Sequence, residues 1–302
     1  MFWSHAAEIA PRKVVALGRF IGRLWAACYG QGLYVMEGGC WRLHPTAPKG
    51  LTGLYADTHR LWFCTWMEGE IGYITDVNNA PKRIPLPRLV TPRFAYRTFC
   101  IVGDANKLWI GSQTHLLRLD IGSQEEVPEW DIVVASDWVN SVVPTRKGVW
   151  VVTAGELWVY KESAQGFSFR AVRSDIGITA MALGVSGKEL WIGSKANVDG
   201  MLWRYEIETQ KWQQITRVPI SSEGIITAVL PVKHLIFISI GSMGFGTMPP
   251  SSVQRSVGVY NIMNHRWQWL EGIQIRDAKC LAVFENRLWV GGVEGIQAVP
   301  IE

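Results

Sequence analysis

The segment from Val77 to Gly103 gathers the side chains of this sequence that are best suited to recognition chemistry. It contains no Asp or Glu, and it interleaves basic with aromatic residues. The basic residues are Lys82, Arg83, Arg88, Arg93 and Arg97, and the aromatic ones are Phe94, Tyr96 and Phe99. Arginine and aromatic side chains dominate the energetics of protein interfaces, and they also stack on single-stranded nucleic acid. A proline-stiffened connector with solvated arginines has the same composition, so three interpretations stay open.

A second segment, from Gly241 to Ser256, has the composition of a long loop that exposes apolar side chains. Glycines and a Pro-Pro pair surround its apolar residues, which are Met243, Phe245 and Met248. Methionine adapts its shape to irregular surfaces, and exposed apolar side chains in a loop indicate either a partner or disorder. The sequence leaves both interpretations open.

The elements that must position these two segments repeat along the chain. The motif Leu-Trp-x-Gly occurs clearly at 108–111, 190–193 and 288–291, and more weakly at four other places. Its aromatic position falls at residues 25, 62, 109, 150, 191, 237 and 289, which lie 37 to 52 residues apart. A repeat of about 40–50 residues with four short strands is the signature of β-propeller blades. We therefore predict an all-β, seven-bladed β-propeller that occupies the whole chain as a single domain.

Each repeat is expected to supply four antiparallel strands, A to D, counted outward from the central channel. The predicted blades are 13–45, 51–87, 98–135, 139–173, 177–217, 225–271 and 277–300. The last repeat ends after its strand C, so we expect residues 2–9 to supply its outer strand and close the ring. The repeated tryptophan stands on strand B in six of the seven repeats, which indicates packing between adjacent blades.

The clearest repeats resemble those of a known family. The strings LWIGSQTHLLRLD (108–120), LWIGSKANVDGMLWRYE (190–206) and LWVGGVEGIQAV (288–299) resemble two-component-regulator propellers, whose motif is Trp-Ile-Gly-Thr followed by Gly-Leu-x-Arg. Segments 205–212 and 260–267 are similar to the hairpin between strands C and D of kelch repeats. The resemblance implies the propeller fold. In regulator propellers the domain senses ligands outside a membrane and is joined to a kinase, and this sequence shows neither a span nor a kinase region. Neither resemblance supplies catalytic residues.

Composition narrows the classes of partner and the compartment. The net charge of +4 is too weak to indicate nucleic acid by itself, and charged residues make up 19% of the chain, below the ~25% typical of soluble domains. The five cysteines show no CxxC pair and no zinc-ligand spacing, so we expect reduced, packed thiols. No run of 18 apolar residues and no signal-peptide pattern occurs, and we place this tryptophan-rich protein in the cytoplasm.

Linear motifs for catalysis are absent from the sequence. It contains no Gly-rich phosphate loop, no HExxH or EF-hand pattern and no GxSxG elbow. Asp175 and Asp277, near the starts of two strands A, are candidates for the channel mouth, but several repeats offer no matching polar residue. We therefore predict no catalytic residue, no metal ion and no cofactor.

Propeller topology places the two recognition segments at the same end of the channel. Loops between strands B and C emerge there with the connections from strand D to the next strand A. The long connections of this kind are 87–97, 194–200 and 241–256. Long loops on a rigid scaffold are where binding residues concentrate.

We therefore predict a non-catalytic protein-interaction scaffold, or a subunit of a larger complex, that binds a protein partner at this end. The predicted contact residues are Arg88, Arg93, Phe94, Tyr96, Arg97, Met243, Phe245 and Met248. The alternative is a propeller enzyme, a lyase or hydrolase, or a small-molecule sensor with its site at the central channel. Nucleic acid is the weaker alternative to a protein partner, and the sequence does not define an oligomeric state.

Overall fold

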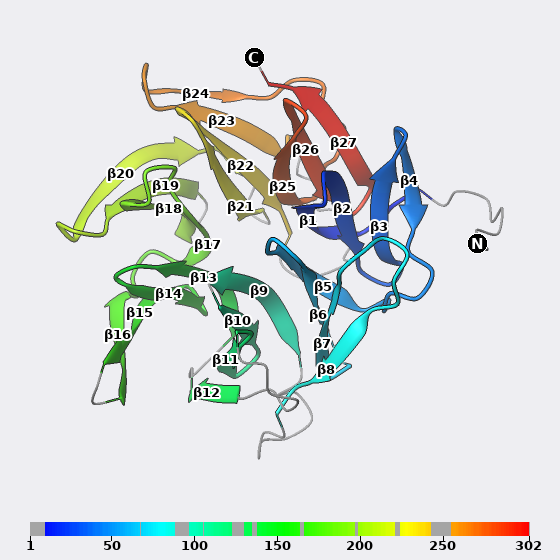
Figure 1. Cartoon of the computed structure of the whole chain (residues 1–302). Helices are drawn as coiled ribbons and strands as arrows, with labels where there is room; N and C mark the ends of the chain where they lie inside the picture. Colours follow the sequence, from blue (N-terminus) through cyan, green and yellow to red (C-terminus); the bar gives the residue numbers. More distant parts are fainter. Residues whose placement is uncertain are drawn as a thin grey trace.

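Each Leu-Trp repeat forms one antiparallel sheet in the computed structural model of the chain, and the sheets are arranged in a ring around a central axis (Figure 1). The structure describes residues 10–66, 68–87, 97–104, 106–122, 130–134, 138–163, 166–196, 199–220, 224–242 and 255–301. Over these residues the regular secondary structure consists of strands, without a helix. The chain is therefore an all-β, seven-bladed β-propeller, as the repeats predict.

The first four blades follow one another along the chain, each with its innermost strand first. Blade one is β1 (Val14–Phe20), β2 (Arg23–Cys28), β3 (Gly32–Glu37) and β4 (Cys40–Leu43). Blade two is β5 (Leu51–Ala56), β6 (Leu61–Thr65), β7 (Glu70–Ile74) and β8 (Lys82–Pro85). Blade three is β9 (Thr98–Asp104), β10 (Lys107–Ser112), β11 (His115–Asp120) and β12 (Trp130–Val134). Blade four is β13 (Val139–Thr145), β14 (Gly148–Thr153), β15 (Glu156–Ser163) and β16 (Gly166–Arg173).

The last three blades complete the circle. Blade five is β17 (Ile178–Leu183), β18 (Glu189–Ala196), β19 (Asp199–Glu206) and β20 (Lys211–Val218). Blade six is β21 (Ile225–Val232), β22 (Leu235–Gly241), β23 (Val257–Asn261) and β24 (Arg266–Trp269). Blade seven is β25 (Ala278–Phe284), β26 (Arg287–Gly292) and β27 (Gly295–Pro300). In blade five the predicted long loop 194–200 is wrong, because β18 and β19 continue their ladder to the pair Ala196–Asp199.

The ring closes where blade seven meets blade one. β1 packs against β25, and the N–H of Lys13 donates to the carbonyl of Val293 at 3.0 Å. In Figure 1 the blue β1 accordingly lies beside the red end of the chain. Within the described residues blade seven has three strands, and β27 forms its outer edge. Residues 2–9, which the sequence predicts as the fourth strand, lie outside the part of the chain that the structure describes.

The core consists of clusters that each span two adjacent blades. Trp150 of blade four packs with Ile178 and Tyr205 of blade five, and Trp109 of blade three packs with Tyr160 of blade four. The Trp150–Tyr205 and Trp109–Tyr160 rings meet edge to face, with centroids 5.2 and 5.4 Å apart. Edge-to-face contact is the favoured geometry for aromatic pairs. The repeated tryptophan is thus an inter-blade packing residue, which confirms the interpretation from the repeats.

The glycine of the Leu-Trp-x-Gly motif marks the closest approach of neighbouring blades. A Cβ added at Gly193 would lie 2.4 Å from Ile226 of the next blade. At Gly111 it would lie 2.6 Å from the carbonyl oxygen of Val139, and at Gly291 2.6 Å from Val14 of blade one. All three partners stand at or next to the start of the following strand A. The motif therefore combines a tryptophan that fills the gap between blades with a glycine that lets their innermost strands meet.

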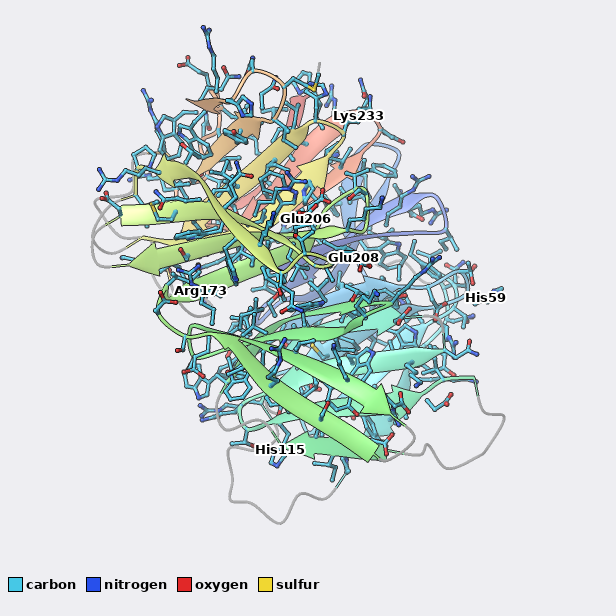
Figure 2. All side chains as sticks on the ribbon, turned by 90° about the vertical axis from the view of Figure 1, so that its left-hand side faces the viewer. His59, His115, Arg173, Glu206, Glu208 and Lys233 are labelled. Atoms are coloured by element: carbon cyan, nitrogen blue, oxygen red, sulfur yellow. The ribbon has the colours of Figure 1, made fainter. Side chains whose placement is uncertain are left out.

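The two ends of the propeller carry different loops. Figure 2 shows the molecule from the side, with His59 toward one end and Arg173 toward the other. His59 lies in the turn between β5 and β6, whereas Arg173 ends β16 and precedes the connection to β17. The end on which Arg173 lies is the one that the sequence predicts for binding.

Candidate binding site at the channel mouth

One position of each innermost strand departs from regular pairing, and it does so in all seven blades. The register of strand A against strand B shifts around a single unpaired residue near the start of strand A. The unpaired residues are Val15, Thr52, Phe99, Asn140, Thr179, Thr227 and Lys279. A β-bulge of this kind bends the strand and re-aims one side chain. We call these seven positions the bulge ring.

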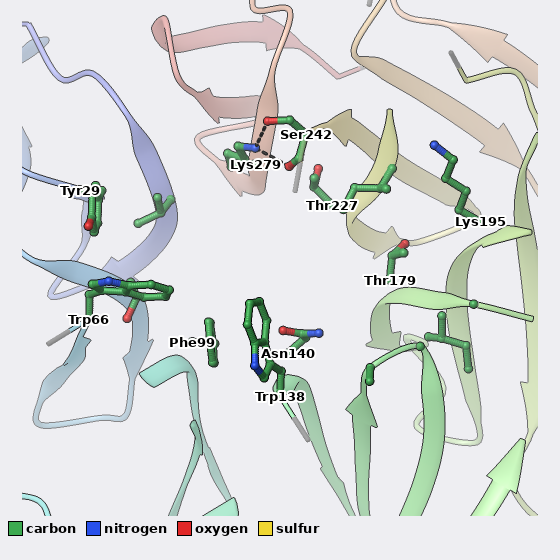
Figure 3. Close-up of a pocket in the computed structure, with 17 residues that line it drawn as sticks. Tyr29, Trp66, Phe99, Trp138, Asn140, Thr179, Lys195, Thr227, Ser242 and Lys279 are labelled. Carbon is green, nitrogen blue, oxygen red and sulfur yellow. Dashed lines mark hydrogen bonds between the residues drawn. The ribbon is translucent and has the colours of Figure 1, made fainter. Parts of the chain in front are cut away.

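The bulge ring lines a cavity of about 800 Å³ at one end of the channel (Figure 3). The wall is completed by residues at the ends of strands B and in the adjoining turns, including Tyr29, Trp66, Lys195 and Ser242. Because these residues lie where strands B lead to strands C, the cavity opens at the predicted binding end. Its volume falls within the ~300–1,000 Å³ of ligand sites.

Aromatic side chains from blades one to four form one side of the cavity, which we call the aromatic arc. Its members are Tyr29, Trp66, Phe99 and Trp138. Trp66 meets Tyr29 and Phe99 edge to face, with centroids 6.4 and 5.3 Å away. Phe99 stacks on Trp138 at 5.5 Å, and Trp138 keeps 40% of its surface exposed. The arc is therefore a continuous apolar surface with an exposed end.

Polar side chains of the bulge ring stand between apolar lining residues such as Ile178 and Ile225, and internal hydrogen bonds hold them. The hydroxyls of Thr52 and Thr179 donate to the strand-B carbonyls of Cys64 and Gly193, at 3.3 and 3.4 Å. Thr227 donates to the carbonyl of Ala278 in the next blade, at 2.6 Å. These bonds orient the threonine side chains and leave hydroxyl lone pairs available as acceptors.

Lys279 and Asp277 form a buried ion pair behind this polar wall. Asp277 is fully buried and Lys279 keeps 7% of its side-chain surface, with Nζ and Oδ1 2.9 Å apart. Lys279 also donates to the carbonyl and the hydroxyl of Ser242, the latter at 2.9 Å. Burial lowers the pKa of the Lys279 ammonium, while its bond to Asp277 opposes that shift. With three acceptors, the three ammonium N–H groups are satisfied, so Lys279 anchors Ser242.

The residues predicted from sequence differ in whether the structure describes them and in whether they lie at the cavity. Arg97 lies at this site, since its guanidinium stands 5.1 Å from the centroid of the Trp66 ring. Asp277 lies behind the cavity wall, where it pairs with the lining residue Lys279, whereas Asp175 is exposed and pairs with Arg173 at 2.7 Å, outside the lining of the cavity. The other predicted contact residues are Arg88, Arg93, Phe94, Tyr96, Met243, Phe245 and Met248, and they lie outside the described residues.

The bulge ring itself was missed by the sequence reasoning, although the sequence carries a signal for it. Phe99 stands ten residues before Trp109, and Lys279 stands ten before Trp289. The same interval holds in six of the seven repeats, and in blade five it is twelve, from Thr179 to Trp191. Aligning the repeats on their aromatic position therefore brings six of these seven residues into one column, and Thr179 joins them when blade five is given a gap of two residues.

At this site, the described side chains are better suited to binding than to catalysis. They contain no cluster of three His, Cys, Asp or Glu side chains that could hold a metal ion. All five cysteines are free thiols, and burial raises the pKa of the Cys64 thiol to about 11. Over the same described residues, no helix is long and apolar enough to cross a membrane.

Comparison with known proteins gives the fold and no family. No protein-family model matches the chain, and no curated protein matches it. The extracellular domain of the putative hybrid two-component system BT4673 from B. thetaiotaomicron superposes with a TM-score of 0.71 at 13% identity. That match covers 97% of this chain but 38% of the other, so this chain spans well under half of that protein domain's length.

Two further solved propellers match over nearly their whole length. The β-propeller domain of Cps50 (Swd1) from Myceliophthora thermophila has a TM-score of 0.71 at 11% identity, covering 99% of this chain and 100% of the other. YCF48 bound to D1 peptide has a TM-score of 0.68 at 11% identity, covering 97% and 95%. At these identities the likeness concerns the fold.

Proposed function

We propose that the chain is a non-catalytic protein-interaction module, a scaffold or a subunit of a larger complex. It binds a segment of a partner protein at the channel-mouth cavity and on the loops of the same end. The observation that carries this proposal is the aromatic arc, because exposed aromatic side chains in a cavity are typical hot spots of protein interfaces. Arg97 beside Trp66 adds the second residue type that such hot spots favour.

Two further facts support the proposal. Lys279, the cavity lysine with the most strongly buried side chain, is held by Asp277 and Ser242 and thus stabilises the wall. One solved propeller of the same fold, YCF48, has been determined in complex with a peptide. The proposed interface includes the predicted contacts Arg88, Arg93, Phe94, Tyr96, Met243, Phe245 and Met248. Because the expected thiols are free, we further propose that the protein works in the cytoplasm.

The test compares partner capture by matched variants. The double variant Phe99→Ala/Trp138→Ala removes part of the aromatic arc, and Val185→Ala/Met263→Ala removes two apolar side chains at the opposite end. Val185 and Met263 are 67% and 77% exposed, so their loss leaves the fold intact. We expect proteins captured stoichiometrically by the wild type to be lost with the arc variant and retained with the control. Equal capture by both folded variants would contradict the proposed site.

A small-molecule sensor is the second candidate, and the polar members of the bulge ring favour it. Five of the seven ring positions are polar, and the cavity volume suits a single ligand of drug size. A metabolite screen by thermal shift distinguishes the two functions. A compound that raises the melting temperature of the wild type but not of the arc variant would favour the sensor.

A further inference from the structure

We infer that the outer edge of β27 is a strand-binding site whose occupant is the chain's own segment 2–9, with Trp3 directly opposite Val299. Within the described residues β27 pairs with β26 alone, whereas the third strand of every other blade has a fourth strand beside it. An unpaired edge of this kind exposes a row of backbone N–H and C=O groups that can pair with another strand. The site lies on the rim of the ring, so it is independent of the function proposed for the channel mouth.

An aromatic residue of the outermost strand covers the third strand in five of the six four-stranded blades. The cross-strand pairs are Met36–Trp41, Leu119–Trp130, Tyr160–Phe169, Tyr205–Trp212 and Tyr260–Trp267. All five aromatic side chains pack against the cluster that their blade shares with the preceding blade. The recurrence indicates that this ring closes the outer side of the contact between two blades.

Val299 occupies the same position in blade seven. It pairs with Leu288 in the ladder, as Tyr260 pairs with Ile236 in blade six. It packs against the cluster between blades six and seven, and it stays partly exposed. The residues at this position in blades three to six are 1–4% exposed, and they are Leu119, Tyr160, Tyr205 and Tyr260. The apolar contact of Val299 is therefore incomplete, and a strand beside β27 would complete it.

The described chain passes the start of β27 on its way into blade one. Pro11 stands four residues before the bulge of β1, and its carbonyl oxygen lies 3.2 Å from where a Cβ on Gly295 would be. In blade six the equivalent residue is Ile275, four before the bulge of β25, and its carbonyl accepts a hydrogen bond from the hydroxyl of Ser256. Gly295 and Ser256 each stand four residues before the covered position of their third strand. The chain therefore enters blade one along blade seven by the same path that it takes into blade seven along blade six.

The spacing selects Trp3 as the aromatic residue of the missing strand. From the aromatic residue of the outermost strand to the bulge of the next blade, the interval is 10 to 15 residues in the five blades. It is 12 from Trp267 to Lys279, and it is also 12 from Trp3 to Val15. Since the path into the next blade is the same in both places, Trp3 takes the position opposite Val299 that Trp267 takes opposite Tyr260.

The composition of the segment agrees with this register. Alternate residues of a strand share one face, so Ala7 and Ile9 lie on the side of Trp3 that faces the cluster. A slip by one residue would instead turn Phe2 and Glu8 toward it, which places a carboxylate against apolar side chains. The segment is also longer than the six residues of β27, so it can cover the whole edge.

Disulfide trapping in the full chain tests the register. With Trp3 opposite Val299, Ser4 lies opposite Ala298, and directly opposed Cα atoms of an antiparallel pair lie within the reach of a disulfide. The test variant is Ser4→Cys/Ala298→Cys. The matched control is Ser4→Cys/Gln297→Cys, because Gln297 faces the other side of β27. Both variants carry Cys40→Ser, which removes the exposed native thiol, and both are treated with oxidised glutathione.

We expect mass spectrometry of proteolytic fragments to find a link between positions 4 and 298 within one chain in the test variant, and no link in the control. The inference is overturned if the control links as readily, or if the folded test variant does not link. A link that joins two chains, seen as a dimer on a non-reducing gel, would assign the edge to a second copy and overturn the assignment to the chain's own segment.

Melting temperatures give a second readout with single substitutions. Trp3→Ala should lower the melting temperature by about 4–8 °C, because it removes a ring packed between two blades. Phe2→Ala, on the opposite face of the segment, should lower it by less. A wild-type melting temperature for Trp3→Ala, or a larger loss for Phe2→Ala, would overturn the inferred position of Trp3. Either failure leaves the function proposed for the channel mouth standing, since neither residue belongs to the lining of the cavity.

Discussion

The buried pair of Lys279 and Asp277 gives a quantitative test of how the cavity wall is stabilised. Replacing Lys279 by Met leaves the fully buried carboxylate of Asp277 without its counter-ion. Loss of one partner of a buried ion pair costs about 3–5 kcal/mol. Asp277 still accepts two hydrogen bonds from Ser242, at 2.6 Å from the backbone N–H and 2.8 Å from the hydroxyl. We therefore expect the low end of that range, about 3 kcal/mol.

Thermal unfolding of three variants measures this effect. At about 2 °C per kcal/mol for a large domain, Lys279→Met should lower the melting temperature by about 6 °C. Lys279→Met/Asp277→Asn should recover part of that loss, because it removes the uncompensated charge. Lys188→Met, exposed at the opposite end, should change stability by less than about 0.5 kcal/mol. The reasoning is refuted if Lys279→Met melts with the wild type, or if the double variant is less stable than the single one.

Three further predictions concern the core. Trp191→Ala should cost about 3–5 kcal/mol, as for other large core aromatics, and an unchanged melting temperature would contradict its packing role. Gly193→Ala should cost about 1–3 kcal/mol by overpacking against the next blade, whereas Gly18→Ala, whose nearest neighbour would be 3.6 Å away, should melt close to the wild type. His44 is 2% exposed, and burial lowers its pKa. As the pH falls, His44 therefore becomes protonated in the unfolded chain before it does in the folded one. The stability it contributes should be complete above about pH 6.5 and should decrease below that pH. His44→Leu should reduce this slope between pH 7.5 and 5, and an identical slope would assign the effect to other groups.

The blade architecture could be predicted because short motifs recur from blade to blade along the chain. Trp109 and Trp191 stand at the same position of strand B in their blades. A residue that recurs in this way is explained by packing rather than by a role in binding or catalysis. The glycines at 111, 193 and 291 are explained by contacts that only the folded ring creates. The repeats therefore predict the number of blades and the order of the strands, while the reason for each motif residue comes from the neighbouring blade.

The cavity was harder to predict because a bulge is a property of a pair of strands. Phe99 and Thr227 have little in common as residues, and only their missing partners on strand B make them equivalent. Aromatic residues such as Trp66 and Trp138 also looked like the packing tryptophans in the sequence. The sequence singled out Arg97, which lies beside Trp66 of the cavity, whereas the other predicted contact residues lie outside the described part of the chain.

The bulge ring places side chains of the cavity wall at positions that the strand pairing does not use. Its residues stand out of the strand ladder, so a change of side chain there alters the chemistry of the mouth while the backbone pairing on either side persists. Each of the seven blades contributes one such position to the mouth. A propeller of this design can change the chemistry of its mouth by single substitutions in the ring without a new loop, although a change at Thr227 or Lys279 also removes a bond that stabilises the wall.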